Sequence, residues 1–201
     1  MEAFLKIYLL IFIILFIVLV FVVPSIRVYN QTGINPFRLT TKQNQVHDFL
    51  GASMKLFIVL LLLVVIIYAL FNAIYRFLAP LEYLEKTTLK IIGLVLGHLA
   101  FIGIIIAQWN MRQSWRIGID YVNKTQLVTV GLFKISRNPI YLFLIIALIG
   151  LFLIIPNAVT FAVLFSAYLI LQVTIRLEED FLEKQHGEVY RNYKQKVSRL
   201  I

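Results

Sequence analysis

The stretch AVTFAVLFSAYLILQV at residues 158–173 is almost wholly apolar, and RLEED at residues 176–180 follows it closely. An apolar run of this length approaches the about 20 residues with which an α-helix crosses a bilayer. Glu178, Glu179 and Asp180 then stand side by side where the helix would leave the membrane. Charge at a membrane surface is usually basic, so three consecutive acids predict a cationic partner.

The whole chain is hydrophobic in the same way as this stretch. Its 201 residues are 61% hydrophobic, and the mean hydropathy is +0.88. Soluble domains have about 45–50% apolar residues, so an ordinary soluble protein is excluded. We expect an all-α integral membrane protein with about five transmembrane helices, because a helix satisfies its own backbone polar groups in the bilayer. The predicted helices lie within residues 7–23, 56–71, 91–107, 140–155 and 158–173.

The first apolar run could also be a secretory signal peptide. However, it is longer than the usual core of about 7–15 residues, and no small-residue cleavage site follows it at Pro24 and Ser25. We therefore expect a retained membrane helix.

The basic residues predict the orientation of the chain. With five crossings, fifteen of the nineteen Lys and Arg residues lie on the side of the C-terminus and four on the other side. The positive-inside rule then places the C-terminus in the cytoplasm. The net charge of +9 is explained by this topology and by anionic lipids, so we expect no nucleic-acid partner. The absence of cysteine excludes a disulfide framework, a thiolate nucleophile and a cysteine zinc site, and no metal site is predicted.

The third run contains GLVLGHLAFIG at residues 93–103, in which Gly93 and Gly97 form a small-residue face for helix packing. His98 lies near the middle of the run. It could bond to the backbone or a hydroxyl of a neighbouring helix, or it could relay protons or contact a ligand, since ionisable groups at membrane depth are often functional.

Two separate segments are expected to meet at the cytoplasmic side. Asn138 and Pro139 predict a helix start, whose free amides favour anionic groups, and Arg137 adds positive charge there. The fourth and fifth runs are separated only by Pro156-Asn157, which predicts a tight turn and a helical hairpin. The end of the fifth helix must therefore return to the start of the fourth.

The acids are expected to continue the fifth helix, with Gly187 as its left-handed cap. Tyr190, Tyr193 and Val197 then recur at helical spacing, which predicts a short amphipathic helix on the cytoplasmic leaflet or over the site. A pocket with an anion-binding helix start and clustered carboxylates suits a ligand that carries both a negative and a positive group. S-adenosylmethionine has a carboxylate, an ammonium and a sulfonium.

Three motifs resemble the isoprenylcysteine carboxyl methyltransferase and phospholipid methyltransferase superfamily: LVTVGLF at residues 127–133, SRNPIY at 136–141, and the acidic segment with its downstream Gly and Tyr residues. SWRIGID at 114–120 resembles a bacterial branch. The resemblance implies a methyltransferase core at 108–201 behind scaffold helices at 1–107, in the bacterial inner membrane.

The resemblance also implies the cofactor S-adenosylmethionine and roles for individual residues. Contacts to the cofactor are implied for Leu127, Val128, Phe133, Asn138, Pro139, Tyr141 and Glu178. Catalytic roles towards the methyl acceptor are implied for Arg137, Arg176 and Glu179. Asn138 and Phe133 stand where many family members have His and Tyr; Asn138 cannot titrate near neutral pH, which excludes a general base there.

The acceptor stays open at this point. An isoprenylcysteine-type carboxylate would be oriented by Arg176 or Arg137, whereas a lipid amine would need Glu179 as a base. The expected partners are membrane lipids and a lipophilic or lipidated substrate. Two other classes are an NADPH-dependent sterol-reductase-like protein and a membrane module of this fold without activity. The sequence predicts no oligomeric state.

Overall fold

The computed structural model describes residues 2–40 and 45–201, which form an α-helical protein. Within these residues there is no β-sheet, and the only β-type pairings are isolated bridges such as the one between Ser136 and Ser198. Lys42, one of the basic residues that predict the orientation, lies outside the described residues. The all-α prediction is confirmed.

Helices cover the predicted apolar runs, except for the last residue of the second and fourth runs, Phe71 and Ile155. Among the described residues, four helical segments are long and apolar enough to cross a membrane, so the chain is an integral membrane protein. These segments are Glu2–Thr32, Gln45–Leu70, Thr87–Ser114 and Ala158–His186. The helix of the fourth run, Pro139–Ile154, is shorter, so the fifth crossing stays a prediction.

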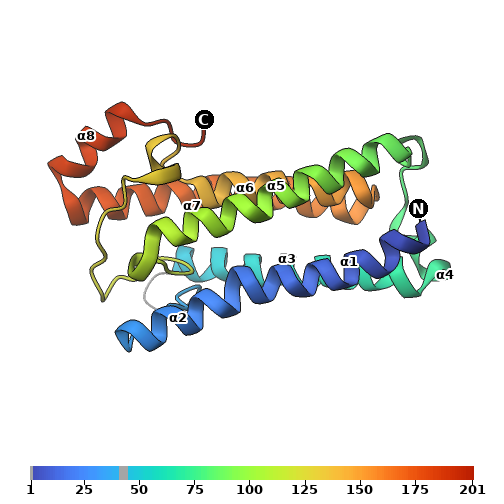
Figure 1. Ribbon diagram of the computed structural model, residues 1–201, viewed down its shortest axis with the longest axis horizontal. Coiled ribbons are helices and arrows are strands. Elements are labelled where there is room, and N and C mark those ends of the chain that lie inside the picture. The colour runs from blue at the N-terminus through green and yellow to red at the C-terminus, as the bar shows by residue number, and fades with distance from the viewer. Residues whose placement is uncertain (1, 41–44) are drawn as a thin grey trace.

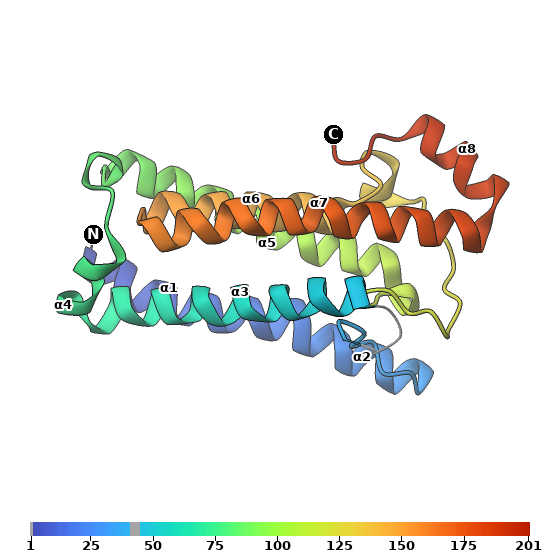
Figure 2. The same cartoon turned by 180° about the vertical axis from the view of Figure 1, so that it is seen from behind.

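The long helices form two layers (Figures 1 and 2). One layer contains α1 and α3, which contact each other, and the other contains α5, α6 and α7, in which α6 contacts both neighbours. The N-terminus lies at the end of the molecule that carries α4, and α8 lies at the opposite end. The main elements in chain order are α1 (Glu2–Ile17), α2 (Val23–Thr32), α3 (Gln45–Leu70), α4 (Asn72–Tyr75), α5 (Thr87–Met111), α6 (Pro139–Ile154), α7 (Ala158–His186) and α8 (Glu188–Lys196).

Glycines bring α5 and α6 into close contact. A Cβ atom on Gly93 would lie 2.5 Å from the carbonyl oxygen of Gly150, and one on Gly150 would lie 2.7 Å from that of Gly93. Side chains at these positions are therefore excluded by backbone, and the predicted packing role of Gly93 is confirmed. The backbone of Gly97 lies in the same contact, because a Cβ on Gly150 would be 3.0 Å from its N atom, but a Cβ on Gly97 itself would meet only the ring of Phe12, at 4.0 Å.

A cluster of buried apolar side chains joins the two layers near the N-terminal end. It combines residues of α1, α3 and the connection from α6 to α7, and most of them are almost fully buried. Its members are Leu5, Leu9, Val64, Val65, Tyr68, Ile154 and Ile155.

The acidic segment continues α7 as predicted, and the helix ends at His186. Gly187 follows with φ of 56° and ψ of −128°. The positive φ agrees with the prediction, but this ψ lies outside the left-handed helical region, because the chain turns directly into α8.

The first helical segment runs past Pro24, although the sequence suggests an end there. Proline has no N–H, so the carbonyl of Val20, four residues earlier, loses its helical donor. The structure forms a π-helical turn at Val18–Val22, and the Gln108 side chain of α5 donates to the Val20 carbonyl oxygen at 2.7 Å. Both residues are buried, so this bond satisfies a carbonyl that would otherwise be unpaired.

We predict that Gln108→Met lowers the free energy of unfolding by about 1–3 kcal/mol, because it leaves the buried Val20 carbonyl without a donor. Thermal unfolding in detergent measures the effect. In a Pro24→Ala background, which restores the backbone donor, the same substitution is expected to cost clearly less. Equal losses in both backgrounds would show that the bond is not the cause.

Candidate functional site

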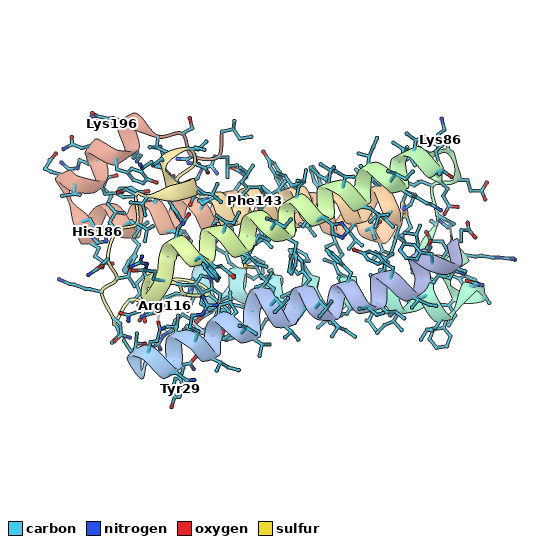
Figure 3. All side chains as sticks on the ribbon, in the orientation of Figure 1. Tyr29, Lys86, Arg116, Phe143, His186 and Lys196 are labelled. Atoms are coloured by element: carbon cyan, nitrogen blue, oxygen red, sulfur yellow. The ribbon has the colours of Figure 1, made fainter. Side chains whose placement is uncertain are left out.

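The start of α6 and the end of α7 meet, as the short connection between them requires. Arg137 donates from Nε to Oε1 of Glu179 at 2.9 Å. One helical turn along α6, the hydroxyl of Tyr141 donates to Oε1 of Glu178 at 2.5 Å. Figure 3 shows Arg116, His186 and Lys196 at this same end of the molecule, far from Lys86. The predicted meeting of the two segments is therefore confirmed.

Glu179 is the centre of a buried ion-pair network. Only 1% of the residue is exposed, and its two carboxylate oxygens face two different arginines. Oε1 pairs with Arg137, and Oε2 accepts from Nε of Arg199 at 2.9 Å. A buried charge needs partners of opposite charge to offset the cost of its desolvation, and here two arginines do so for one carboxylate. Glu179 is thus fully engaged by the protein itself.

Residues 194–199, here called the C-terminal strap, cross the start of α6. Nη1 of Arg137 donates to the carbonyl oxygens of Lys194 and Val197, and its backbone N–H donates to that of Ser198 at 2.9 Å. On the α8 side, the Tyr193 hydroxyl donates to the Phe133 carbonyl at 2.6 Å. The short helix is therefore folded over the site, one of the two positions that the sequence left open.

Asn138 occupies the predicted N-cap position, with Pro139 as the first helical residue, but its side chain makes no capping bond in the described structure. Nδ2 donates instead to Oε1 of Glu179 and to the carbonyl of Arg199, both at 3.1 Å. The amide thus joins α6, α7 and the C-terminal strap. An amide suits this position because it donates without carrying charge.

A cavity of about 330 Å³ lies between the two helix layers. Its polar end is formed by Glu178, Arg137, Asn138, Tyr141 and Arg116. Away from this end the walls are apolar and come from α1, α3, α5, α6 and α7. Along α6 the lining runs from Tyr141 to Ile154, a helical rise of about 20 Å at about 1.5 Å per residue.

The structure separates the sequence-predicted site residues into two groups. Six of them line the cavity, namely Phe133, Arg137, Asn138, Pro139, Tyr141 and Glu178. Leu127, Val128, Arg176 and Glu179 are not among its lining residues in the described structure. Arg176 is exposed and donates to the carbonyl of Gln172, while Leu127 and Val128 are half-buried in the loop before Gly131. The roles implied for these residues stay predictions.

The sequence did not indicate the contribution of α1 and α3 to the cavity. Their lining residues are ordinary apolar side chains, apart from Tyr8 and His47. His47 is buried, and its Nε2 accepts the backbone N–H of Ile119 at 3.1 Å. A single histidine near the start of an apolar helix gives little signal, and the bond to Ile119 is a long-range contact.

Asp120 stabilises the loop that contains it, between α5 and α6, beside the polar end of the cavity. Its carboxylate lies 3.4 Å from Arg38 and 3.5 Å from Arg116, and it accepts the backbone N–H groups of Val122 and Asn123. Burial alone would raise the pKa of Asp120, but the hydrogen bonds from Asn123 and Val122 and the charge of Arg38 lower it below its ordinary value. The carboxylate thus ties Arg116, a cavity residue, to its loop.

A family model described as phospholipid methyltransferase matches residues 87–189, about half of the chain. The chain belongs to the phospholipid methyltransferase family. It is therefore a membrane methyltransferase, and the resemblance found in the sequence is confirmed. The matched region begins with α5 and includes the junction of Arg137, Glu178 and Glu179. Comparisons with curated proteins and with solved structures find no match.

For this member of the phospholipid methyltransferase family we predict that Glu179→Gln lowers stability by about 3 kcal/mol, because Arg137 loses its buried counter-charge. Thermal unfolding and protease cleavage near the C-terminus measure the loss. Glu183→Gln is the matched control on the same helix, since Glu183 pairs with Arg191 and Lys194 at the surface. Equal losses in both variants would contradict the special role of Glu179.

The lowered pKa of Asp120 predicts a pH dependence. A carboxylate whose folded pKa is depressed stabilises the protein above its unfolded value of about 3.9, and this contribution is lost as pH falls through the folded pKa. Asp120→Asn should therefore lower the unfolding temperature at pH 7 and differ less from the wild type only as the pH falls below about 3.9. Asp180→Asn, which changes an exposed acid, is the control. A pH-independent difference would refute the assignment.

Proposed function

We propose that the protein transfers a methyl group from S-adenosylmethionine to a lipophilic acceptor at the polar end of the cavity. The observation that carries this proposal is the continuity of the cavity, which joins the carboxylate of Glu178 to an apolar channel at membrane depth. Methyltransferases of this family generally use S-adenosylmethionine. An amphipathic acceptor would place its reacting group beside Glu178 and its chain between the helix layers.

The residues at the polar end fit the charges of the cofactor. Oε1 of Glu178 accepts from Tyr141, so Oε2 can face a cationic group in surroundings where charge interactions are strong. The first intrahelical bond of α6 joins the Leu142 N–H to the Asn138 carbonyl. The amides of Ile140 and Tyr141 before it therefore have no intrahelical acceptor and can bind a carboxylate. Phe133 and Trp115 add aromatic rings to the same wall.

When bound, S-adenosylmethionine supplies a methyl group on a positively charged sulfur. The protein's own task is then mainly alignment of the acceptor. An amine acceptor must first lose a proton from its ammonium form, and Oε2 of Glu178 is suited to receive it. Tyr141 holds the carboxylate in place through Oε1.

The charges at the polar end favour a lipid amine over an isoprenylcysteine-type carboxylate. Arg137 is occupied by Glu179 and by carbonyls of the C-terminal strap, and Arg116 by Asp120 and two backbone carbonyls. An acceptor carboxylate would thus meet Glu178, and neither arginine of the described lining, Arg116 or Arg137, would be free to balance it. An ammonium group would meet an opposite charge. Arg176 and Glu179 keep their implied roles near the acceptor only as hypotheses.

We further propose a cytoplasmic C-terminus and a location in the bacterial inner membrane. The concentration of basic residues on the side of the C-terminus supports the orientation. Residues 108–201 would form the methyltransferase core. Residues 1–107 would act as more than a scaffold, because α1 and α3 line the cavity that takes the acceptor.

We predict that Glu178→Gln weakens S-adenosylmethionine binding by about tenfold or more, since a tenfold change corresponds to only about 1.4 kcal/mol of lost charge attraction. Calorimetry on the detergent-purified protein measures it. S-adenosylhomocysteine, which lacks the sulfonium charge, is the matched ligand: a loss confined to S-adenosylmethionine would place Glu178 beside the sulfur. NADPH serves as the ligand of the reductase class.

Labelled S-adenosylmethionine with a lipid extract then identifies the acceptor. Label in an aminophospholipid is the expected result. Binding of NADPH alone, or no binding of either cofactor, would refute the proposal, and Asp180→Asn controls for a general loss of negative charge.

A further inference from the structure

The deep end of the cavity is closed by the apolar cluster that joins the two layers. Leu9, Val65 and Ile154 belong both to that cluster and to the cavity lining. The distance from Tyr141 to this floor, about 20 Å along α6, exceeds the about 15 Å that one leaflet contributes to a hydrocarbon core of about 30 Å. The lining along α6 is therefore longer than the hydrocarbon thickness of one leaflet.

Gly97 borders this deep end, and although its backbone N packs against Gly150 of α6, its own Cβ position faces open space. A Cβ on Gly93 would collide with backbone, and one on Gly103 would lie 2.5 Å from the ring of Phe143. A Cβ on Gly97 would meet only Phe12, at 4.0 Å, and both residues line the cavity. The protein could accommodate a side chain here, but that side chain would fill the cavity.

The polar pair at the deep end needs no partner from a ligand. Nδ1 of His98 lies 2.7 Å from the Leu94 carbonyl, which can only accept, so Nδ1 carries the proton. Nε2 is then the acceptor for the Tyr8 hydroxyl at 2.7 Å. Both groups are satisfied within the protein, which leaves an end suited to hydrocarbon.

We propose that the deep end holds the terminal part of a hydrocarbon chain of the acceptor, and that Gly97 sets the longest chain that fits. This inference rests on the proposed function, because it names the part of the acceptor that lies away from the reacting group. It makes Gly97, with Phe12 opposite it, a determinant of chain-length specificity.

Lysophosphatidylethanolamines of graded chain length test the inference. Their binding to the detergent-purified full-length protein is measured by native mass spectrometry without S-adenosylmethionine. For the wild type we expect affinity to rise with chain length and then to level. Gly97→Leu should level at a shorter chain, with about fourfold lost for each methylene that no longer fits. Phe12→Ala should level at a longer chain.

One control separates this effect from general damage. Ala162→Leu enlarges an exposed residue of α7 that does not line the cavity. It should keep the wild-type limit. An equal shift of the limit in Ala162→Leu and Gly97→Leu would overturn the inference.

The two substitutions at the deep end decide the outcome together. If Gly97→Leu binds all chains poorly, the decision falls to Phe12→Ala, and an unchanged limit there overturns the inference. Failure of the wild type to bind any chain also overturns it. Because no cofactor is present, a failure of methyl transfer would leave these measurements unaffected.

Discussion

The site depends on the buried carboxylate of Glu179. Arg137 approaches it from the start of α6 and Arg199 from the C-terminal strap, so one side chain of α7 fixes both elements. A buried charge tolerates the loss of a partner poorly, which makes the arrangement cooperative. With Glu179 held in this way, the preceding acid is left to face the cavity.

The two neighbouring acids differ because of helix geometry. Consecutive residues in an α-helix point in directions about 100° apart, so Glu178 and Glu179 cannot face the same partner. Glu178 turns to Tyr141 and the cavity, whereas Glu179 turns to the arginines. The sequence places both acids at the correct end of the molecule but does not indicate which faces the ligand. That choice depends on how α7 is rotated against α6.

Local signals predicted the junction well, and contacts between distant segments limited the rest. The short connection at Pro156-Asn157 and the Asn138-Pro139 start were enough to bring α6 and α7 together. The hydrogen bonds of the Asn138 side chain were not predicted, because its partners, Glu179 and Arg199, are far away in sequence. The cavity walls formed by α1 and α3 were not predicted either, because an apolar residue that faces a cavity cannot be distinguished in sequence from one that faces lipid. The continuation past Pro24 was also not predicted, because Gln108, which donates to the Val20 carbonyl, is 88 residues away from it.

The C-terminal strap has a consequence for biosynthesis. Its contacts with Arg137 and Asn138 involve residues 194–199, which follow α6 and α7 in the chain. The ribosome therefore makes these two helices before the residues that cover their junction. The polar end of the cavity can close on this side only after translation has passed Arg199.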